Sequence, residues 1–131
     1  MANSRPLSPH LSIWKWRVHM ATSIFHRATG AALLFGGLSL LTWWLVAAAT
    51  SPEAYATFLK VATSWFGWLV LVGLSWSFFQ HLCSGVRHLL MDTGWGYELG
   101  TAKASATTVF ITAALLTIAF WAVVLFTRGV I

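Results

Sequence analysis

Three long stretches of this sequence contain no charged side chain. They lie between Arg27 and Glu53, between Lys60 and Arg87, and between Lys103 and Arg128. Each stretch exceeds the roughly 20 residues with which an α-helix crosses a hydrocarbon core of about 30 Å. The sequence therefore predicts an all-α membrane protein with three transmembrane helices, over about residues 23–49, 61–87 and 104–127.

The composition agrees with a single domain that lies in a membrane. Of the 131 residues, 58% are hydrophobic and 8% are charged, whereas about a quarter of a soluble domain is charged. The net charge of +5 then indicates basic cytoplasmic loops rather than a nucleic-acid partner. The start of the chain is too polar for a secretory signal and lacks the character of a transit peptide. We therefore expect a bacterial cytoplasmic membrane rather than a mitochondrial one.

The segments that border the spans have patterns of their own. Residues 1–19 contain Pro6 and Pro9, which disfavour a helix, and then two tryptophans beside basic side chains. This mixture is typical of an interfacial segment on the cytoplasmic side. Residues 51–53, Ser-Pro-Glu, indicate a turn, and residues 54–60 are expected to form a short amphipathic piece that leads into the second span.

The distribution of lysine and arginine predicts the orientation. One side of the membrane collects Arg5, Lys15, Arg17, Arg27, Arg87 and Lys103. The other side has Lys60 and Arg128. By the positive-inside rule, the N-terminus and the loop 89–103 are cytoplasmic, and the C-terminus lies outside.

The second span ends in a stretch that carries His81 and His88. His81 lies inside the apolar run, where an ionisable side chain is costly and usually functional. On a helix, Ser77, Ser84, Gly85 and His88 fall within about 60° of His81. This small, polar face suits close approach by another helix or a flat cofactor, because glycine has no side chain to block it. Spacing alone leaves two interpretations of His81: a metal ligand, or a histidine hydrogen-bonded to a neighbouring helix.

The start of the first span carries a second polar group. Ser23, His26, Arg27 and Gly30 share one helix face, and they enter the membrane on the side where the second span leaves it. Arg27 with His26 can hold anionic groups such as haem propionates. Taken singly, Ser23 also suits a helix N-cap, and Arg27 suits a lipid-phosphate anchor. The polar groups of the second span lie across from them, and together the two sets favour a binding site over these structural roles.

The number of histidines in the spans limits how a haem could be held. A b-type haem usually needs two axial imidazoles, one on each face of the ring. His81 and His88 lie about 10.5 Å apart along one helix face. The third span has no histidine, and the first has only His26 at its mouth. If His81 binds a haem, the second axial ligand must come from another chain.

Three motifs carry a resemblance to a known family. They are Arg-Pro-Leu-Ser-Pro-His-Leu at residues 5–11, Ser-Ile-Phe-His-Arg-Ala-Thr-Gly at 23–30, and His-x-x-x-Gly-x-Arg-His-x-x-x-Asp at 81–92. In this order, with three spans, they resemble the cytochrome b556 subunit of succinate dehydrogenase, one of two membrane anchors of respiratory complex II. The resemblance implies a helical bundle with a second anchor subunit, a shared haem b, and electrons that reach ubiquinone from succinate through a flavoprotein subunit and an iron–sulfur subunit.

The resemblance also implies roles for individual residues. His81 corresponds to the axial haem ligand, and the second axial histidine belongs to the other anchor subunit. Ser23 and Arg27 correspond to residues of the quinone site. The residues that would support the haem or its propionates are His26, Arg27, Arg87 and His88. Two more positions match the motif without a defined role: Gly85 and Asp92.

Other functions share part of this pattern. The same architecture could anchor a quinol:fumarate reductase, since the direction of the reaction depends on cofactor potentials. A membrane scaffold or transporter subunit without a cofactor is a different class. Against it stand His81 in mid-helix and the clustered polar groups on the cytoplasmic side. A transporter would also be expected to show broken helices or inverted repeats.

Overall fold

The computed structural model describes residues 13–129, and this part of the chain is helical without strands. The elements are α1 (Val18–Ala32), the π-helical turn η2 (Leu33–Gly37), α2 (Leu38–Thr50), α3 (Pro52–Ala62), α4 (Trp65–Asp92) and α5 (Leu99–Thr127). α1, η2 and α2 form one continuous run, so that three helices are long and apolar enough to cross a membrane. The prediction of an all-α membrane protein with three spans is confirmed.

Two serines fix where the helices of the far end begin. Ser51 is extended and accepts a hydrogen bond from the backbone N–H of Ala54, while Pro52 takes the first position of α3. Ser64 accepts a hydrogen bond from the backbone N–H of Gly67 in the same way and starts α4. Both are N-caps, which satisfy backbone donors that the first helical turn leaves free.

The helices extend beyond the predicted spans at the end where α1 begins, the predicted cytoplasmic end. The first begins at Val18 rather than near 23, the second ends at Asp92 rather than near 87, and the third begins at Leu99 rather than near 104. The prediction stopped at charged side chains. A helix does not end there, because long arginine and lysine side chains can reach the head groups from within it. The predicted amphipathic piece 54–60 is part of α3.

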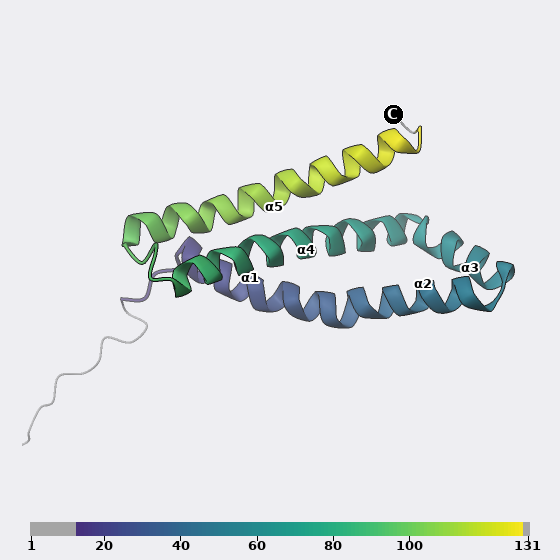
Figure 1. The fold of residues 1–131 in the computed structure, drawn as a ribbon, viewed down its shortest axis with the longest axis horizontal. Helices are drawn as coiled ribbons and strands as arrows, with labels where there is room; N and C mark the ends of the chain where they lie inside the picture. The colour runs from purple at the N-terminus through teal and green to yellow at the C-terminus, as the bar shows by residue number, and fades with distance from the viewer. Residues whose placement is uncertain (1–12, 130–131) are drawn as a thin grey trace, which may run out of the picture.

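α1, α4 and α5 pack together, and Figure 1 shows α1 beside α4 at the end where the chain begins. α2 packs against α3, which connects it to α4 at the opposite end. Where α1, α4 and α5 meet, the buried residues are small or polar. The buried residues on α5 are Ala106, Val109, Ala113 and Thr117. Close helix contact through small residues is usual in membranes, where lipid tails are as apolar as leucine.

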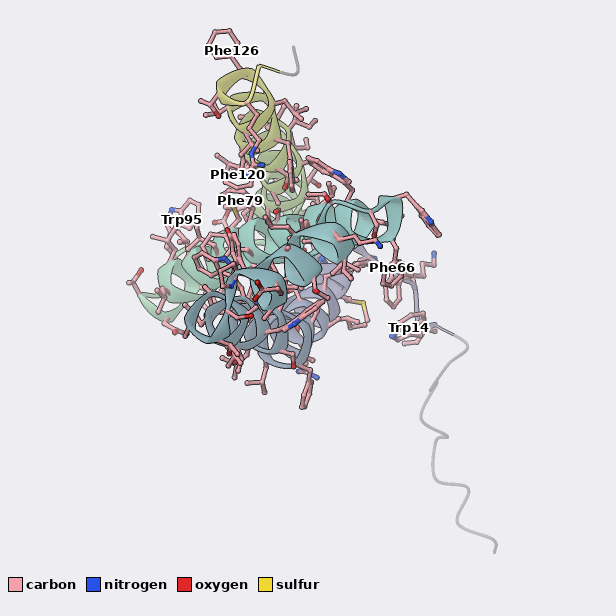
Figure 2. All side chains as sticks on the ribbon, turned by 90° about the vertical axis from the view of Figure 1, so that its right-hand side faces the viewer. Trp14, Phe66, Phe79, Trp95, Phe120 and Phe126 are labelled. Atoms are coloured by element: carbon pink, nitrogen blue, oxygen red, sulfur yellow. The ribbon has the colours of Figure 1, made fainter. Side chains whose placement is uncertain are left out.

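Large apolar side chains radiate outward from the helices, as Figure 2 shows for Phe66, Trp95 and Phe126. Phe126 is 75% exposed, which fits a surface in contact with lipid or with another chain.

The expected interfacial segment is described only from residue 13. There Trp14 and Trp16 lie edge to face with ring centroids 5.7 Å apart, before α1 begins. Pro6, Pro9 and the motif at residues 5–11 lie outside the described residues.

Candidate functional site

The packing of α1 against α4 brings three histidines into one cluster. The rings of His26 on α1 and His81 on α4 are stacked, with centroids 4.0 Å apart and planes 10° from parallel. The ring of His88, two turns further along α4, lies 5.1 Å from that of His26. We call His26, His81 and His88 the histidine cluster. The sequence placed these residues on facing helices at one membrane side, and the structure brings them together.

A hydrogen bond to α1 fixes the orientation of His81. Its Nδ1 lies 3.0 Å from the backbone carbonyl oxygen of His26 and 3.5 Å from Oγ1 of Thr29. Because a carbonyl oxygen can only accept, Nδ1 carries a hydrogen, and in the neutral imidazole Nε2 then keeps its lone pair. This is the arrangement of a metal-binding histidine, in which the second ring nitrogen donates to a carbonyl.

Gly30 makes the space in which the His81 ring lies. A Cβ atom added to Gly30 would come within 2.9 Å of Cε1 of His81, closer than real side chains approach. A Cβ at Gly85 would meet Cε1 of His26 at 3.7 Å, an ordinary contact. Within this chain, therefore, the imidazole approaches α1 at Gly30, and Gly85 adds room on the α4 side of the cluster.

Thr29 supports the same contact, although the sequence did not single it out. It is buried, and its hydroxyl donates to the carbonyl oxygen of Phe25 at 2.6 Å. Because its own hydrogen is donated to Phe25, its oxygen can only accept from the Nδ1–H group of His81, which lies 3.5 Å away. A threonine that bonds back to its own helix is common in membrane helices, so its position in the motif 23–30 was the only available signal.

The polar face of α4 divides into two parts. The buried residues are Ser77, Gln80, Ser84 and Arg87, which turn toward the other helices of this chain. His81, Gly85 and His88 lie at the edge of that face and are half-buried. The predicted face joined Ser77 and Ser84 of the buried set with the three residues of this edge, and it did not include Gln80 or Arg87. The structure leaves the histidine edge accessible to a group or a helix from outside the chain.

Gln80 was missed by the sequence reasoning. It is completely buried, and neither its amide oxygen nor its amide nitrogen has a hydrogen-bond partner within residues 13–129. The same holds for the hydroxyl of Ser84. The sequence shows a glutamine directly before His81. It does not show that this glutamine is buried, because its burial depends on how α1 and α5 pack on α4.

Arg87 joins α4 to α5 through hydrogen bonds within the chain. It is 7% exposed, and its Nε donates to Oγ of Ser105 at 3.0 Å while Nη2 donates to the carbonyl oxygen of Ala102 at 3.4 Å. Its expected support of a haem or quinone would thus act through the position of α4, because its guanidinium is already bonded inside the chain.

Ser23 and Arg27 lie one turn apart on α1, which allows their side chains to converge on one ligand. Ser23 is half-buried and Arg27 is exposed. The alternative role of Ser23 as an N-cap is wrong, since the cap of α1 is Arg17, and Ser23 lies more than a turn inside the helix. Capping of the helix therefore does not account for the hydroxyl group of Ser23.

A cavity of about 410 Å³ opens at the mouth of the site, where α1 and α5 begin and α4 ends. It contains the motif residues Arg87, His88 and Asp92, together with His19 and Tyr97, which the sequence reasoning had not assigned. Asp92 is the last residue of α4 and is exposed. The cavity therefore gathers titratable groups beside the histidine cluster at the predicted cytoplasmic end.

The donor set is suited to one bond from this chain to a metal centre. Within residues 13–129, no three His, Cys, Asp or Glu side chains are arranged to hold a metal ion. His26 stacks flat on His81 and cannot face it across an iron atom. Among the histidines of residues 13–129, His81 is the one with a hydrogen-bonded Nδ1 inside a candidate membrane helix, which leaves Nε2 of the neutral ring as a possible ligand.

Comparison with known proteins adds an independent line of evidence. Residues 1–120 match the model of the succinate dehydrogenase/fumarate reductase transmembrane subunits. The chain is 47% identical over 103 residues to the succinate dehydrogenase cytochrome b556 subunit of Paracoccus denitrificans, which covers 79% of this chain and 78% of the relative. With the cytochrome b556 subunit of Rickettsia felis it shares 38% identity over 119 residues, 91% of this chain and 92% of the relative.

A mitochondrial relative is similar as well. The succinate dehydrogenase cytochrome b560 subunit of Mus musculus is 35% identical over 119 residues, 87% of this chain and 68% of the relative. The family match includes all of α1 and α4, the helices that carry the histidine cluster. The chain therefore belongs to the family of succinate dehydrogenase/fumarate reductase transmembrane subunits.

Proposed function

We propose that this chain is the haem-binding membrane anchor of a succinate:ubiquinone oxidoreductase. A flavoprotein subunit oxidises succinate, and an iron–sulfur subunit passes the electrons to ubiquinone beside this anchor. The observation that carries the proposal is the arrangement of His81. Its ring lies against Gly30, its Nδ1–H donates to the carbonyl of His26, and its Nε2 remains available as a ligand inside a membrane helix.

The residues present fit one axial contact to a haem b. His81 would supply that contact through Nε2, and the hydrogen bond from Nδ1 would hold its ring and raise its basicity as a ligand. His26, Arg27 and His88 would hold the propionates at the mouth, and Arg87 would keep α4 in register with α5. When bound, the haem supplies a centre that takes up and returns single electrons.

A second anchor subunit would complete the haem site. His88 shares a helix with His81, and His26 is stacked on it, so that neither faces His81 across a ring. A second imidazole for the haem would therefore come from another chain. That partner would have a surface to bind. It consists of the half-buried edge of α4 and the large apolar side chains that point outward.

Ser23 and Arg27 would form this chain's part of the quinone site. Reduction of ubiquinone to ubiquinol takes two electrons and two protons. The Ser23 hydroxyl and the Arg27 guanidinium can donate hydrogen bonds to a quinone carbonyl oxygen and stabilise the negative charge that develops there. His88 and Asp92 lie in the mouth cavity, where protons from the cytoplasm can be taken up. Because the electrons and the protons would reach the quinone from the same side of the membrane, the reaction itself would build no membrane potential.

The test compares two activities of the purified complex. A charge-assisted hydrogen bond in apolar surroundings contributes roughly 1.5–3 kcal/mol. Ser23→Ala and Arg27→Leu should therefore slow ubiquinone reduction about ten- to hundredfold or more, at about 1.4 kcal/mol per decade. Succinate oxidation with an artificial acceptor that takes electrons upstream should be nearly unchanged.

Two variants serve as controls: Ser39→Ala, an exposed serine of α2, and Lys103→Leu, a cation at the same membrane side. Both should leave the two activities at wild-type levels. All variants are compared at equal assembly and haem content. Wild-type ubiquinone reduction in both Ser23→Ala and Arg27→Leu would show that the quinone is bound elsewhere.

A further inference from the structure

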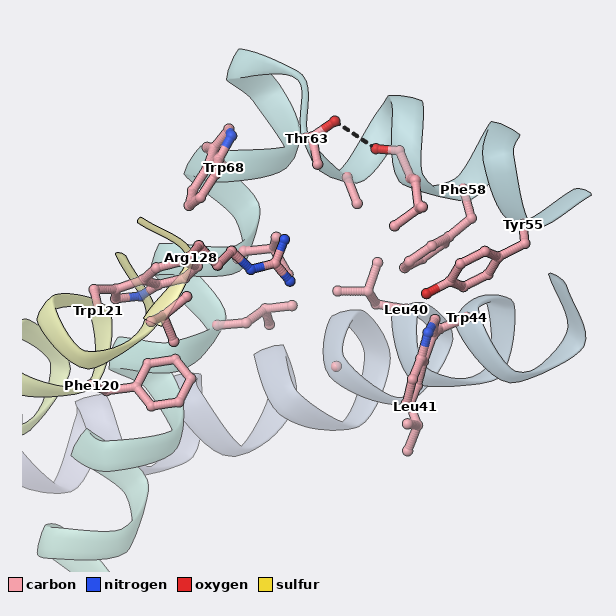
Figure 3. A pocket seen from close by; sticks show the side chains of 16 residues that line it. Leu40, Leu41, Trp44, Tyr55, Phe58, Thr63, Trp68, Phe120, Trp121 and Arg128 are labelled. Carbon is pink, nitrogen blue, oxygen red and sulfur yellow. Dashed lines mark hydrogen bonds between the residues drawn. The ribbon is translucent and has the colours of Figure 1, made fainter. Parts of the chain in front are cut away.

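A second cavity lies at the opposite end of the molecule from the histidine cluster. It is a groove of about 570 Å³ between α2, α3, α4 and the end of α5, which we call the apolar groove. Figure 3 shows its walls, which include Leu40, Trp44, Phe58, Trp68 and Phe120. These side chains come from four helices, and none of the described lining residues is acidic.

One cation overlooks this groove. Arg128 follows the last residue of α5, and in Figure 3 its guanidinium group extends over the space between Trp68, Trp121 and Leu40. The helix dipole favours an arginine at a helix C-terminus. This preference accounts for the position of Arg128 but not for the apolar groove beside it. A guanidinium fits a phosphate group through two parallel hydrogen bonds.

Other polar groups lie at the same groove. Nε1 of Trp121 is buried and has no hydrogen-bond partner within the described residues. Tyr55 also lines the groove, and Figure 3 shows its hydroxyl pointing toward Leu40. Tryptophan and tyrosine are typical of the depth at which the acyl chains of a membrane meet its head groups.

Charge at this end favours an anionic group. The acidic side chain here, Glu53, belongs to the first turn of α3 and does not line the groove. Hydrogen bonds from its own backbone N–H and then from the Ser51 hydroxyl lower the pKa of Glu53 below its usual value. It is thus engaged at its own helix start. Arg128 therefore lies beside an apolar groove, and in a membrane the acyl chains of lipids would surround the openings of that groove.

We propose that the apolar groove binds one phospholipid, whose phosphate is held by Arg128 and whose acyl chain lies between α2, the start of α4 and the end of α5. The lipid would fill a space that α3 keeps open by holding α2 apart from α4. This site lies at the far membrane surface from the histidine cluster, so that it does not depend on the haem or quinone proposals.

The test uses the purified complex in nanodiscs of phosphatidylcholine that contain a phosphatidylglycerol with a photoreactive diazirine on its acyl chain. Illumination followed by peptide mass spectrometry should locate crosslinks on the groove segments 37–44, 55–63 and 68–74. Arg128→Gln should reduce these crosslinks several-fold. The matched control, Lys60→Gln, removes an exposed cation at the same end that does not line the groove and should leave them unchanged.

Two further arms keep the outcome decisive. Leu40→Trp should exclude the acyl chain and remove the crosslinks while Arg128 remains. Excess inorganic phosphate should not displace the lipid, since a free ion gains nothing from the apolar walls. Crosslinks that are absent from the wild-type groove would mean that another subunit covers it, and crosslinks equal in wild type and Arg128→Gln would mean that no phosphate is held there. Either result overturns the proposal.

Discussion

Gly30 is the residue that allows the imidazole of His81 to lie against α1. The 2.9 Å approach of an added Cβ to Cε1 of His81 leaves no space for a side chain. The ring would have to move, and the 3.0 Å hydrogen bond from its Nδ1 to the carbonyl of His26 would be strained or lost. The orientation of the proposed ligand thus depends on a residue of the neighbouring helix that itself touches no metal.

Gly30→Ala should therefore reduce the haem content of the purified complex or shift its b-type absorption bands, although this chain still reaches the membrane. Gly37→Ala is the control, because an added Cβ there meets Leu33 only at 3.8 Å in the same helical run. The measurement is haem per complex and the position of the bands. If both variants match the wild type, the ring of His81 is not held as described.

Single residues also show what the sequence could and could not predict. The histidines and Gly30 were identifiable because an ionisable group in an apolar run is costly and helix spacing places neighbours on one face. The burial of Gln80 and the inward turn of Arg87 toward Ser105 were not, because both depend on α5, which carries no chemical motif. The supposed N-cap role of Ser23 failed because α1 begins before it, at Val18.

At the scale of helices, the junction between α3 and α4 is sharply constrained. Only Thr63 and Ser64 separate the two helices. Gly67 is buried under the end of α3, and an added Cβ would overlap the carbonyl oxygens of Val61 and Ala62. Backbone cannot move aside as a flexible side chain can. The sequence predicted a short piece before the second span but not this contact, which depends on the angle between the helices.

Gly67→Ala should destabilise the complex by about 1–3 kcal/mol or more, the usual effect of overpacking. Gly100→Ala is its control, since nothing lies within 4 Å of a Cβ there and alanine favours a helix over glycine by roughly 0.5–1 kcal/mol. Thermal unfolding of the purified complexes measures the difference. Equal midpoints for Gly67→Ala and the wild type would contradict the packing of this junction.

At the scale of the whole molecule, the two ends differ in chemistry. The histidine cluster, the mouth cavity and most of the basic side chains lie at the end where α1 begins, and α3 with the apolar groove lies at the other. The sequence predicted the difference in charge and the polar groups at one end from charge counts and helix spacing, but it did not predict the apolar groove. It could not predict that the third span would enclose the polar interior of α4, since the residues of α5 that do so are small and carry no pattern of their own.

The asymmetry predicts the topology of the chain in the membrane. A reporter that is active only outside the cytoplasm should be active when fused after Ile131, and inactive when inserted in the loop between α4 and α5 at residues 93–98. The reverse pattern of activities would place the histidine cluster at the outer surface, away from a cytoplasmic electron donor.

The ligand role of His81 is tested most directly by the reduced-minus-oxidised absorption spectrum of the purified complex. His81→Ala should abolish or shift the b-type bands, because it removes the nitrogen that this chain is proposed to offer to a haem iron. His88→Ala removes a second imidazole of the same cluster, on the same helix, and should leave the bands in place. Intact bands in His81→Ala together with their loss in His88→Ala would contradict the assignment.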